Sequence, residues 1–171
     1  MTEAENAENA IGVWGGNENG AVYYTSKDSK QIKALTESLV GERFEGVNEF
    51  KMCVEADVTR DEPDAANYLN CVYQMTAEDK DAAEQIYESI APMYSNHDDS
   101  STGKSKGWTY TICAEETGSS EGISYYIVHG IYIKGNEVIY VYGITASDND
   151  KTSIAYICKD LGLVSPYSLM K

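Results

Sequence analysis

Long apolar runs and a conventional export signal are both missing from this sequence of 171 residues. The longest apolar segment, Ile123 to Ile133, is interrupted by Ser124, His129 and Gly130, and it is shorter than the ~20 residues of a membrane helix. The first ten residues are acidic and polar, unlike a signal peptide. We therefore expect no transmembrane segment, and either a cytoplasmic protein or one whose export signal has been removed.

Basic residues are scarce. The chain has 13 basic and 28 acidic residues, a formal net charge of −15. The first 20 residues carry four glutamates and no basic residue, so the rest of the chain keeps a charge of −11. Such a surface repels nucleic acid and anionic lipid, and we expect no direct binding to either. Solubility is the simplest reason for the acidity; a basic partner protein or mimicry of nucleic acid are the alternatives.

Closely spaced metal ligands are also lacking. The four cysteines are far apart in the sequence, with no C-x-x-C pair, so neither a zinc site nor any other metal or cofactor site is predicted. The simpler interpretation is four small buried side chains. The alternative is two disulfides in an oxidising compartment, for which strand parity favours the pairs Cys53–Cys113 and Cys71–Cys158.

Glycine, asparagine, alanine and glutamate dominate the start of the chain, which predicts a flexible acidic tail over 1–20 and one domain over 21–171. Within the domain, Ser26 or Asp28 is the expected cap of a first helix that ends at Gly41, and Thr76 is the expected cap of a second. We expect helices over about 26–40, 76–94 and 148–161, and strands over 50–58, 68–75, 108–115, 123–133 and 138–145.

Short turns join most of these strands, including a tight hairpin at Lys134 to Glu137, and short turns indicate antiparallel pairing. The polar segment from Ser95 to Gly107 is expected to be a loop, and an additional strand near Val22 to Tyr24 is the alternative start of the domain. The predicted fold class is α+β: an antiparallel sheet of about five strands with helices packed mainly on one face, in the order (β)-α-β-β-α-β-β-β-α.

Catalytic residues are hard to find. His97 lies in the polar loop beside Asp98 and Asp99, and His129 lies inside a strand, where a space-filling, hydrogen-bonded histidine is the simpler interpretation. A hydrolase using His129 and acidic residues stays open, as does a Cys–His pair if His129 approaches a cysteine. Asp148-Asn149-Asp150 resembles the start of a calcium loop, but helix capping explains the same residues.

Tyrosine is the one residue in clear excess, with 14 against two phenylalanines. Five fall in the last predicted hairpin. Consecutive tyrosines in a strand point to opposite faces, so one face of this hairpin is expected to present aromatic rings to a protein or carbohydrate. The alternative is that tyrosine simply has high strand propensity and packs at the edge of the core. The candidate binding residues are Tyr125, Tyr126, Tyr132, Tyr140 and Tyr142.

The acidic Ala/Glu/Asn segment from Thr2 to Gly20, followed by a small tyrosine-rich domain, is similar in texture to extracellular lipoproteins of Gram-positive bacteria. That resemblance covers only the tail and the composition, and it implies a tether that holds the domain at the cell surface. The first hypothesis is therefore a non-enzymatic extracytoplasmic binding domain, either secreted or at the cell surface. The alternatives are an intracellular acidic inhibitor or adaptor and a small hydrolase.

Overall fold

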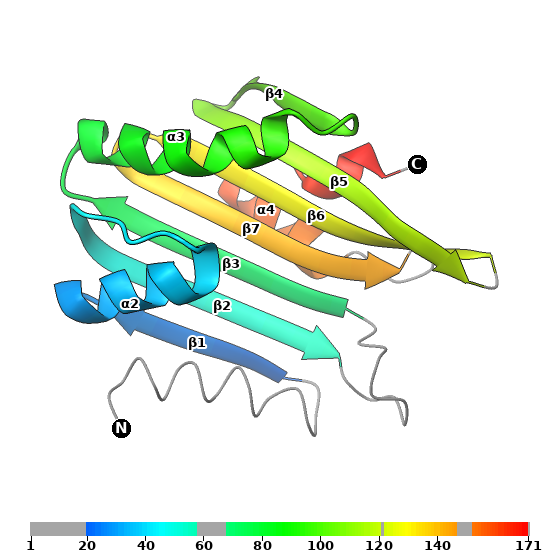
Figure 1. Ribbon diagram of the computed structural model, residues 1–171, viewed down its shortest axis with the longest axis horizontal. Coiled ribbons are helices and arrows are strands. Elements are labelled where there is room, and N and C mark those ends of the chain that lie inside the picture. Colours follow the sequence, from blue (N-terminus) through cyan, green and yellow to red (C-terminus); the bar gives the residue numbers. More distant parts are fainter. Residues whose placement is uncertain (1–19, 58–67, 121, 147–151, 171) are drawn as a thin grey trace.

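The computed structural model describes residues 20–57, 68–120, 122–146 and 152–170 (Figure 1). The predicted tail, the acidic turn after residue 57 and the Asp148-Asn149-Asp150 motif therefore lie outside the described residues, apart from Gly20. The elements are β1 (Gly20–Ser26), α2 (Ser29–Val40), β2 (Val47–Asp57), β3 (Tyr68–Ala77), α3 (Lys80–Ser95), β4 (Ser100–Ser105), β5 (Trp108–Ser120), β6 (Ile123–Lys134), β7 (Glu137–Ala146), α4 (Thr152–Leu161) and the 3-10 helix η1 (Pro166–Leu169).

All seven described strands form one sheet in the order β1-β2-β3-β7-β6-β5-β4, and every neighbouring pair is antiparallel. Two runs of sequential strands, β1-β2-β3 and β4-β5-β6-β7, meet where β3 pairs with β7. In this central pairing Cys71 lies opposite Tyr142 and Tyr73 lies opposite Tyr140. The prediction of an α+β fold with an antiparallel sheet is thus confirmed.

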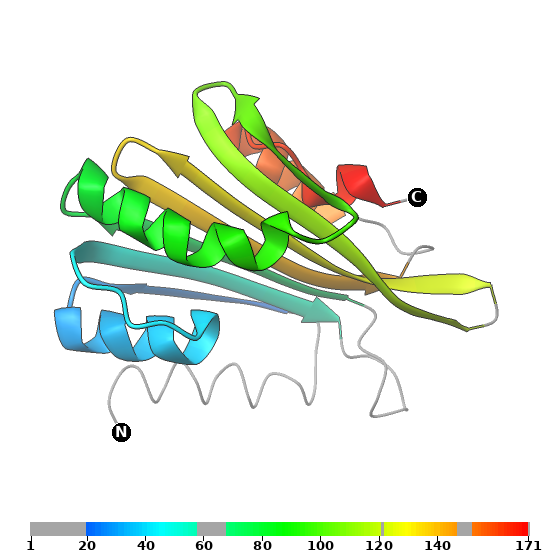
Figure 2. The same cartoon turned by 45° about the horizontal axis from the view of Figure 1, so that its top comes forward.

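Helices cover both faces of the sheet (Figures 1 and 2). Helices α2 and α3 lie on one face, over a core that includes Leu35, Phe50 and Ile90. Helix α4 and η1 lie on the other, over a second core that includes Ile154 and Tyr167. We call these the α2/α3 face and the α4 face.

Local capping explains where the first two helices begin. The Asp28 carboxylate accepts a hydrogen bond from the Gln31 backbone N–H at 2.9 Å, and Gly41 ends α2 with a φ of +86°. The Asp79 carboxylate accepts one from the Ala82 backbone N–H at 2.8 Å at the start of α3. Asp28 and Gly41 therefore act as predicted. Thr76 does not cap α3, because β3 continues to Ala77.

Two details of the predicted fold are wrong. The sheet has seven strands, because the strand expected as an alternative near Val22 forms and because the polar segment after α3 contains β4 instead of being a loop throughout. Edge strand β4 is rich in Ser, Thr and Lys and alternates between half-buried and exposed, which hides it from an apolar pattern. Helix α4 packs on the face opposite α2 and α3, so the helices do not share one face. Among the described helices, none is long and apolar enough to cross a membrane.

Candidate functional site

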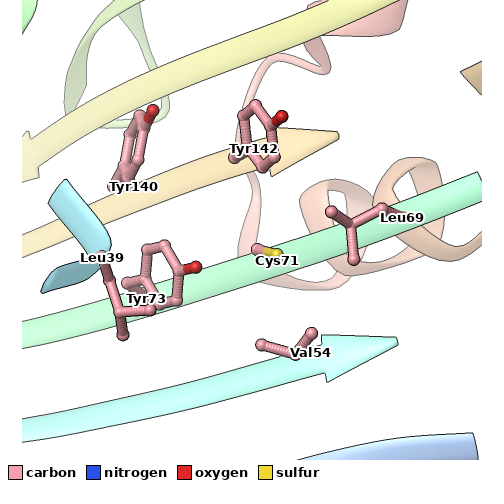
Figure 3. A pocket seen from close by; sticks show the side chains of 7 residues that line it. All are labelled: Leu39, Val54, Leu69, Cys71, Tyr73, Tyr140 and Tyr142. Atoms are coloured by element: carbon pink, nitrogen blue, oxygen red, sulfur yellow. The ribbon is translucent and has the colours of Figure 1, made fainter. Parts of the chain in front are cut away.

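A pocket of about 230 Å³ opens on the α2/α3 face beside the C-terminal part of α2 (Figure 3). We call it the tyrosine pocket. Four adjacent elements supply its walls: α2, β2, β3 and β7. The lining side chains are Leu39, Val54, Leu69, Cys71, Tyr73, Tyr140 and Tyr142.

Strand register explains why these side chains converge. Val54 of β2 lies opposite Cys71 of β3, and Cys71 in turn lies opposite Tyr142 of β7. Residues directly opposite each other in antiparallel strands share a face, so they form one row across the sheet. Tyr73 and Tyr140 form the next row, with ring centroids 5.9 Å apart. The pocket is therefore built on the rigid centre of the sheet.

Tyr140 is anchored behind the pocket by two hydrogen bonds. Its hydroxyl lies 2.9 Å from the Tyr94 hydroxyl of α3 and 2.9 Å from His129 Nδ1 of β6. The Tyr94 ring stacks on the His129 imidazole with centroids 4.1 Å apart. This network ties α3 to β6 and β7 and fixes the orientation of one aromatic wall.

The titratable groups of the pocket are held in their neutral forms. Burial raises the pKa of Cys71 to about 11, and it also raises the pKa values of Tyr73, Tyr140 and Tyr142. Burial, with a smaller contribution from His97, lowers the pKa of His129 to about 4. At neutral pH the site therefore offers apolar surface, the hydroxyls of Tyr73 and Tyr142 and the Cys71 thiol, without charge.

His129 of β6 lies opposite Cys113 of β5 in the strand register. A Cys–His nucleophile pair also requires the two side chains to lie within hydrogen-bonding distance and the thiol to be activated. The electrostatics oppose activation. Burial, with Glu115 and Asp99, raises the pKa of the Cys113 thiol, whereas an activated cysteine needs a lowered one. His129 is neutral, and its Nδ1 is engaged by Tyr140. His129 is thus a half-buried histidine hydrogen-bonded to Tyr140, in line with the simpler interpretation.

The other candidate histidine lies on the surface. His97 follows α3, and its Nδ1 is 3.9 Å from a carboxylate oxygen of exposed Glu115. Over the residues that the structure describes, no three or more His, Cys, Asp or Glu side chains are grouped so as to hold a metal ion.

The five candidate tyrosines do not form one surface. Tyr126 and Tyr132 are buried on the α4 face, where the Tyr132 hydroxyl donates to the Val164 carbonyl at 2.6 Å. Their proposed role in an exposed contact surface is therefore wrong: the packing of α4 and η1 encloses them. Tyr140 and Tyr142 point to the opposite face and line the tyrosine pocket, while Tyr125 is half-buried.

The alternative of two disulfides does not hold, since all four cysteines are free. Three strands separate β2 from β5, so Cys53 and Cys113 are roughly 19 Å apart at the usual strand spacing. A disulfide joins Cα atoms within about 7 Å. Cys71 packs on the α2/α3 face and Cys158 on the α4 face, so the sheet itself lies between them.

The lining or supporting residues that were not singled out from the sequence are Leu39, Val54, Leu69, Tyr73 and Tyr94. Strand alternation places Tyr73 on the same face as Cys71, so the sequence alone could have identified Tyr73. The approach of Leu39 and Tyr94 depends on how the helices pack, which no local pattern specifies.

No protein-family model matches this chain, and no curated protein sequence matches it either. Among solved structures, the chain is similar to the extracellular domain of PknH from Mycobacterium tuberculosis. The sequence identity is 13%, the alignment covers 82% of this chain and 81% of that one, and the TM-score is 0.42. A likeness this weak carries no argument about activity or ligand.

Proposed function

We propose that the chain is a non-enzymatic extracytoplasmic binding domain and that the tyrosine pocket takes one uncharged, ring-sized group of its ligand. The observation that carries the proposal is the convergence of Tyr73, Tyr140 and Tyr142 with Cys71 in a single opening on the sheet. Apolar walls with a few placed polar groups are typical of small-molecule sites.

Size limits the ligand. The pocket volume of about 230 Å³ exceeds an engineered cavity of about 150 Å³ that accepts benzene. It therefore accommodates one aromatic or sugar ring, or one large side chain of a peptide. Offset stacking against the tyrosine rings supplies the contact area, and the hydroxyls supply orientation.

Charge limits it further. An ionic group entering this site would lose water without meeting an opposite charge, because burial keeps the lining phenols and the Cys71 thiol neutral. The site therefore favours neutral groups that donate or accept hydrogen bonds. The same neutrality argues against hydrolysis, because neither His129 nor Cys113 is tuned toward an activated state.

The extracytoplasmic placement rests on composition. The acidic, Asn- and Gly-rich segment before the domain fits a tether at the cell surface, where a small binding domain meets extracellular ligands. Fractionation of the source cells tests this part directly. Recovery of the intact chain from the cytoplasm would contradict it and would favour the intracellular adaptor.

A titration with indole, followed by methyl NMR spectra, tests the pocket. Indole is a neutral ring with one donor, so it matches the lining chemistry. We expect saturable shifts at the methyl groups of Leu39, Val54 and Leu69, with methyls under α4, such as Ile154, unmoved. Shifts spread evenly over both faces, or none at high concentration, would contradict the proposal.

A further inference from the structure

A second pocket, of about 350 Å³, lies at the end of the sheet between α3 and two hairpin turns. Helix α3 contributes one side of it through residues spaced at i, i+4, i+7 and i+8, and the β4–β5 and β6–β7 hairpins contribute the other. We call it the lysine pocket. The side chains that carry its chemistry are Lys80, Glu84, Tyr87, Glu88, Lys104 and Lys134.

Two of its lysines form no salt bridge within the described structure, although the chain is acidic. Acidic residues outnumber basic ones by 28 to 13, and four described lysines pair with carboxylates, as in Lys33–Glu45 and Lys51–Glu49. Lys30, Lys106 and Lys159 form no such pair with a described residue. Within the described part of the chain, Lys104 and Lys134 make no salt bridge. Lys104 and Lys134 thus line one opening together with the Lys80–Glu84 pair and Glu88, so the lining lysines outnumber the lining carboxylates by three to two.

Local packing holds Lys134 in place. Its Nζ lies 5.6 Å from the Trp108 ring centroid, within the range of a cation–π contact. Its aliphatic part runs past Gly107, where an added Cβ would lie 3.4 Å from Lys134 Cε. Gly107 also has a φ of +86°, which closes the β4–β5 turn tightly enough to bring Lys104 to the same opening.

The α3 side of the pocket supplies acceptors. Glu84 is engaged by Lys80 at 2.7 Å, whereas Glu88 forms no ion pair with any described residue. A carboxylate beside an anion site repels a second negative charge but accepts hydrogen bonds from hydroxyl groups. Between the two sides, Tyr87 and Ile133 give an apolar floor, and the Tyr87 hydroxyl is already bonded to Thr111 Oγ1 at 2.9 Å.

We propose that the lysine pocket binds a small hydroxylated phosphate ester, such as a sugar phosphate. Lys104 and Lys134 would hold the phosphate, since ammonium groups act as compact charges for phosphate oxygens. Glu88 would accept the hydroxyls, and Tyr87 with Ile133 would pack against the ring. This site is separate from the tyrosine pocket and does not depend on the function proposed there.

Calorimetry and amide NMR with glucose 6-phosphate, glucose and inorganic phosphate, at constant ionic strength, test the assignment. We expect glucose 6-phosphate to bind more tightly than either of the other two, with shifts at the Gly107, Thr109 and Gly135 amides. The double variant Lys104→Gln/Lys134→Gln keeps the aliphatic stems and is expected to weaken that binding by about tenfold or more. Lys159→Gln, on α4, is the matched control and should leave it unchanged.

Three results would overturn the proposal. The first is equal binding of glucose 6-phosphate to the double variant and the wild type, with both folded by circular dichroism. The second is equal affinity for phosphate and glucose 6-phosphate, which would show that the hydroxyl acceptors contribute nothing. The third is binding to vesicles containing phosphatidylglycerol without binding to glucose 6-phosphate, which would assign the lysines to a membrane surface.

Discussion

Tyr140 is the residue on which the pocket wall depends, because its hydroxyl joins Tyr94 and His129 at 2.9 Å each. Tyr140→Phe removes both hydrogen bonds and leaves two half-buried partners unsatisfied. We expect a loss of about 1–3 kcal/mol in the free energy of unfolding, measured by urea denaturation. Tyr110→Phe is the matched control, since the Tyr110 hydroxyl makes no hydrogen bond with the described residues, and it should cost less than about 0.5 kcal/mol. Equal effects of the two variants would mean that the network contributes nothing.

The half-buried His129 should make the free energy of unfolding depend on pH, and the sign of this dependence follows from the pKa of His129. Burial lowers the pKa in the folded protein to about 4, below the unfolded value of about 6.5. Between these values the unfolded chain binds the extra proton, so the stability is fully present above about pH 6.5 and falls as the pH drops toward 4. Relative to His129→Gln, we expect the wild type to lose about 2 kcal/mol more between pH 7 and pH 5.

Urea denaturation of the wild type and of His129→Gln at the two pH values gives this difference. The contributions of the carboxylates to the pH dependence cancel, because both proteins carry the same carboxylates. His97→Gln serves as the control, since exposed His97 lies on the surface beside Glu115. A wild type and a His129→Gln variant with the same pH slope would contradict the burial of a neutral histidine.

At the scale of elements, α4 and η1 depend on a close approach to the sheet at Gly143 of β7. A Cβ added there would lie 2.9 Å from Ile154 Cδ1, 3.0 Å from the Tyr167 hydroxyl and 3.0 Å from Val128 Cγ2. Gly143→Ala is expected to push these elements from the sheet and to cost about 1–3 kcal/mol in the free energy of unfolding.

Gly118→Ala in β5 provides the comparison for this substitution, because an added Cβ there meets nothing within 4 Å. Thermal unfolding, followed by circular dichroism, measures the effect. The midpoint temperature of Gly143→Ala should be lower than that of the wild type, and that of Gly118→Ala should be nearly unchanged. If both glycines tolerate alanine equally, α4 does not pack as closely as described.

Some helices and strands could be predicted from the sequence and others could not. Alternating apolar residues located β2 and β5, and apolar periodicity with capping residues located α2 and α3, because these signals are local. The polar edge strand β4 lacks an apolar alternation and was missed. The placement of α4 was missed because β6 and β7 are apolar on both faces, so the pattern does not say which face a helix covers.

The candidate site was predicted only in part for a related reason. Tyr140 and Tyr142 were among the predicted binding residues, but the same reasoning included Tyr126 and Tyr132, which α4 and η1 bury. Parity separates these two pairs onto opposite faces. Which face stays open is decided by the packing of distant helices, and strand parity alone does not encode it.

At the scale of the whole molecule, the sheet separates two cores and leaves an uncharged pocket in a chain of net charge −15. The acidity keeps the surface soluble and repels anions at long range. That field does not affect a neutral ligand of the tyrosine pocket, whereas it repels an anionic ligand that approaches the lysine pocket. Binding of glucose 6-phosphate should therefore strengthen as salt screens the net charge, until screening of the Lys104 and Lys134 contacts dominates.

The most direct test of the central claim fills the tyrosine pocket. Leu69→Trp adds bulk from the β3 wall, and Leu161→Trp makes the same change at an exposed leucine of α4. With both variants folded by circular dichroism, we expect calorimetry to show that Leu69→Trp abolishes indole binding while Leu161→Trp retains the wild-type affinity. Undiminished indole binding to Leu69→Trp would contradict the assignment of the tyrosine pocket as the binding site.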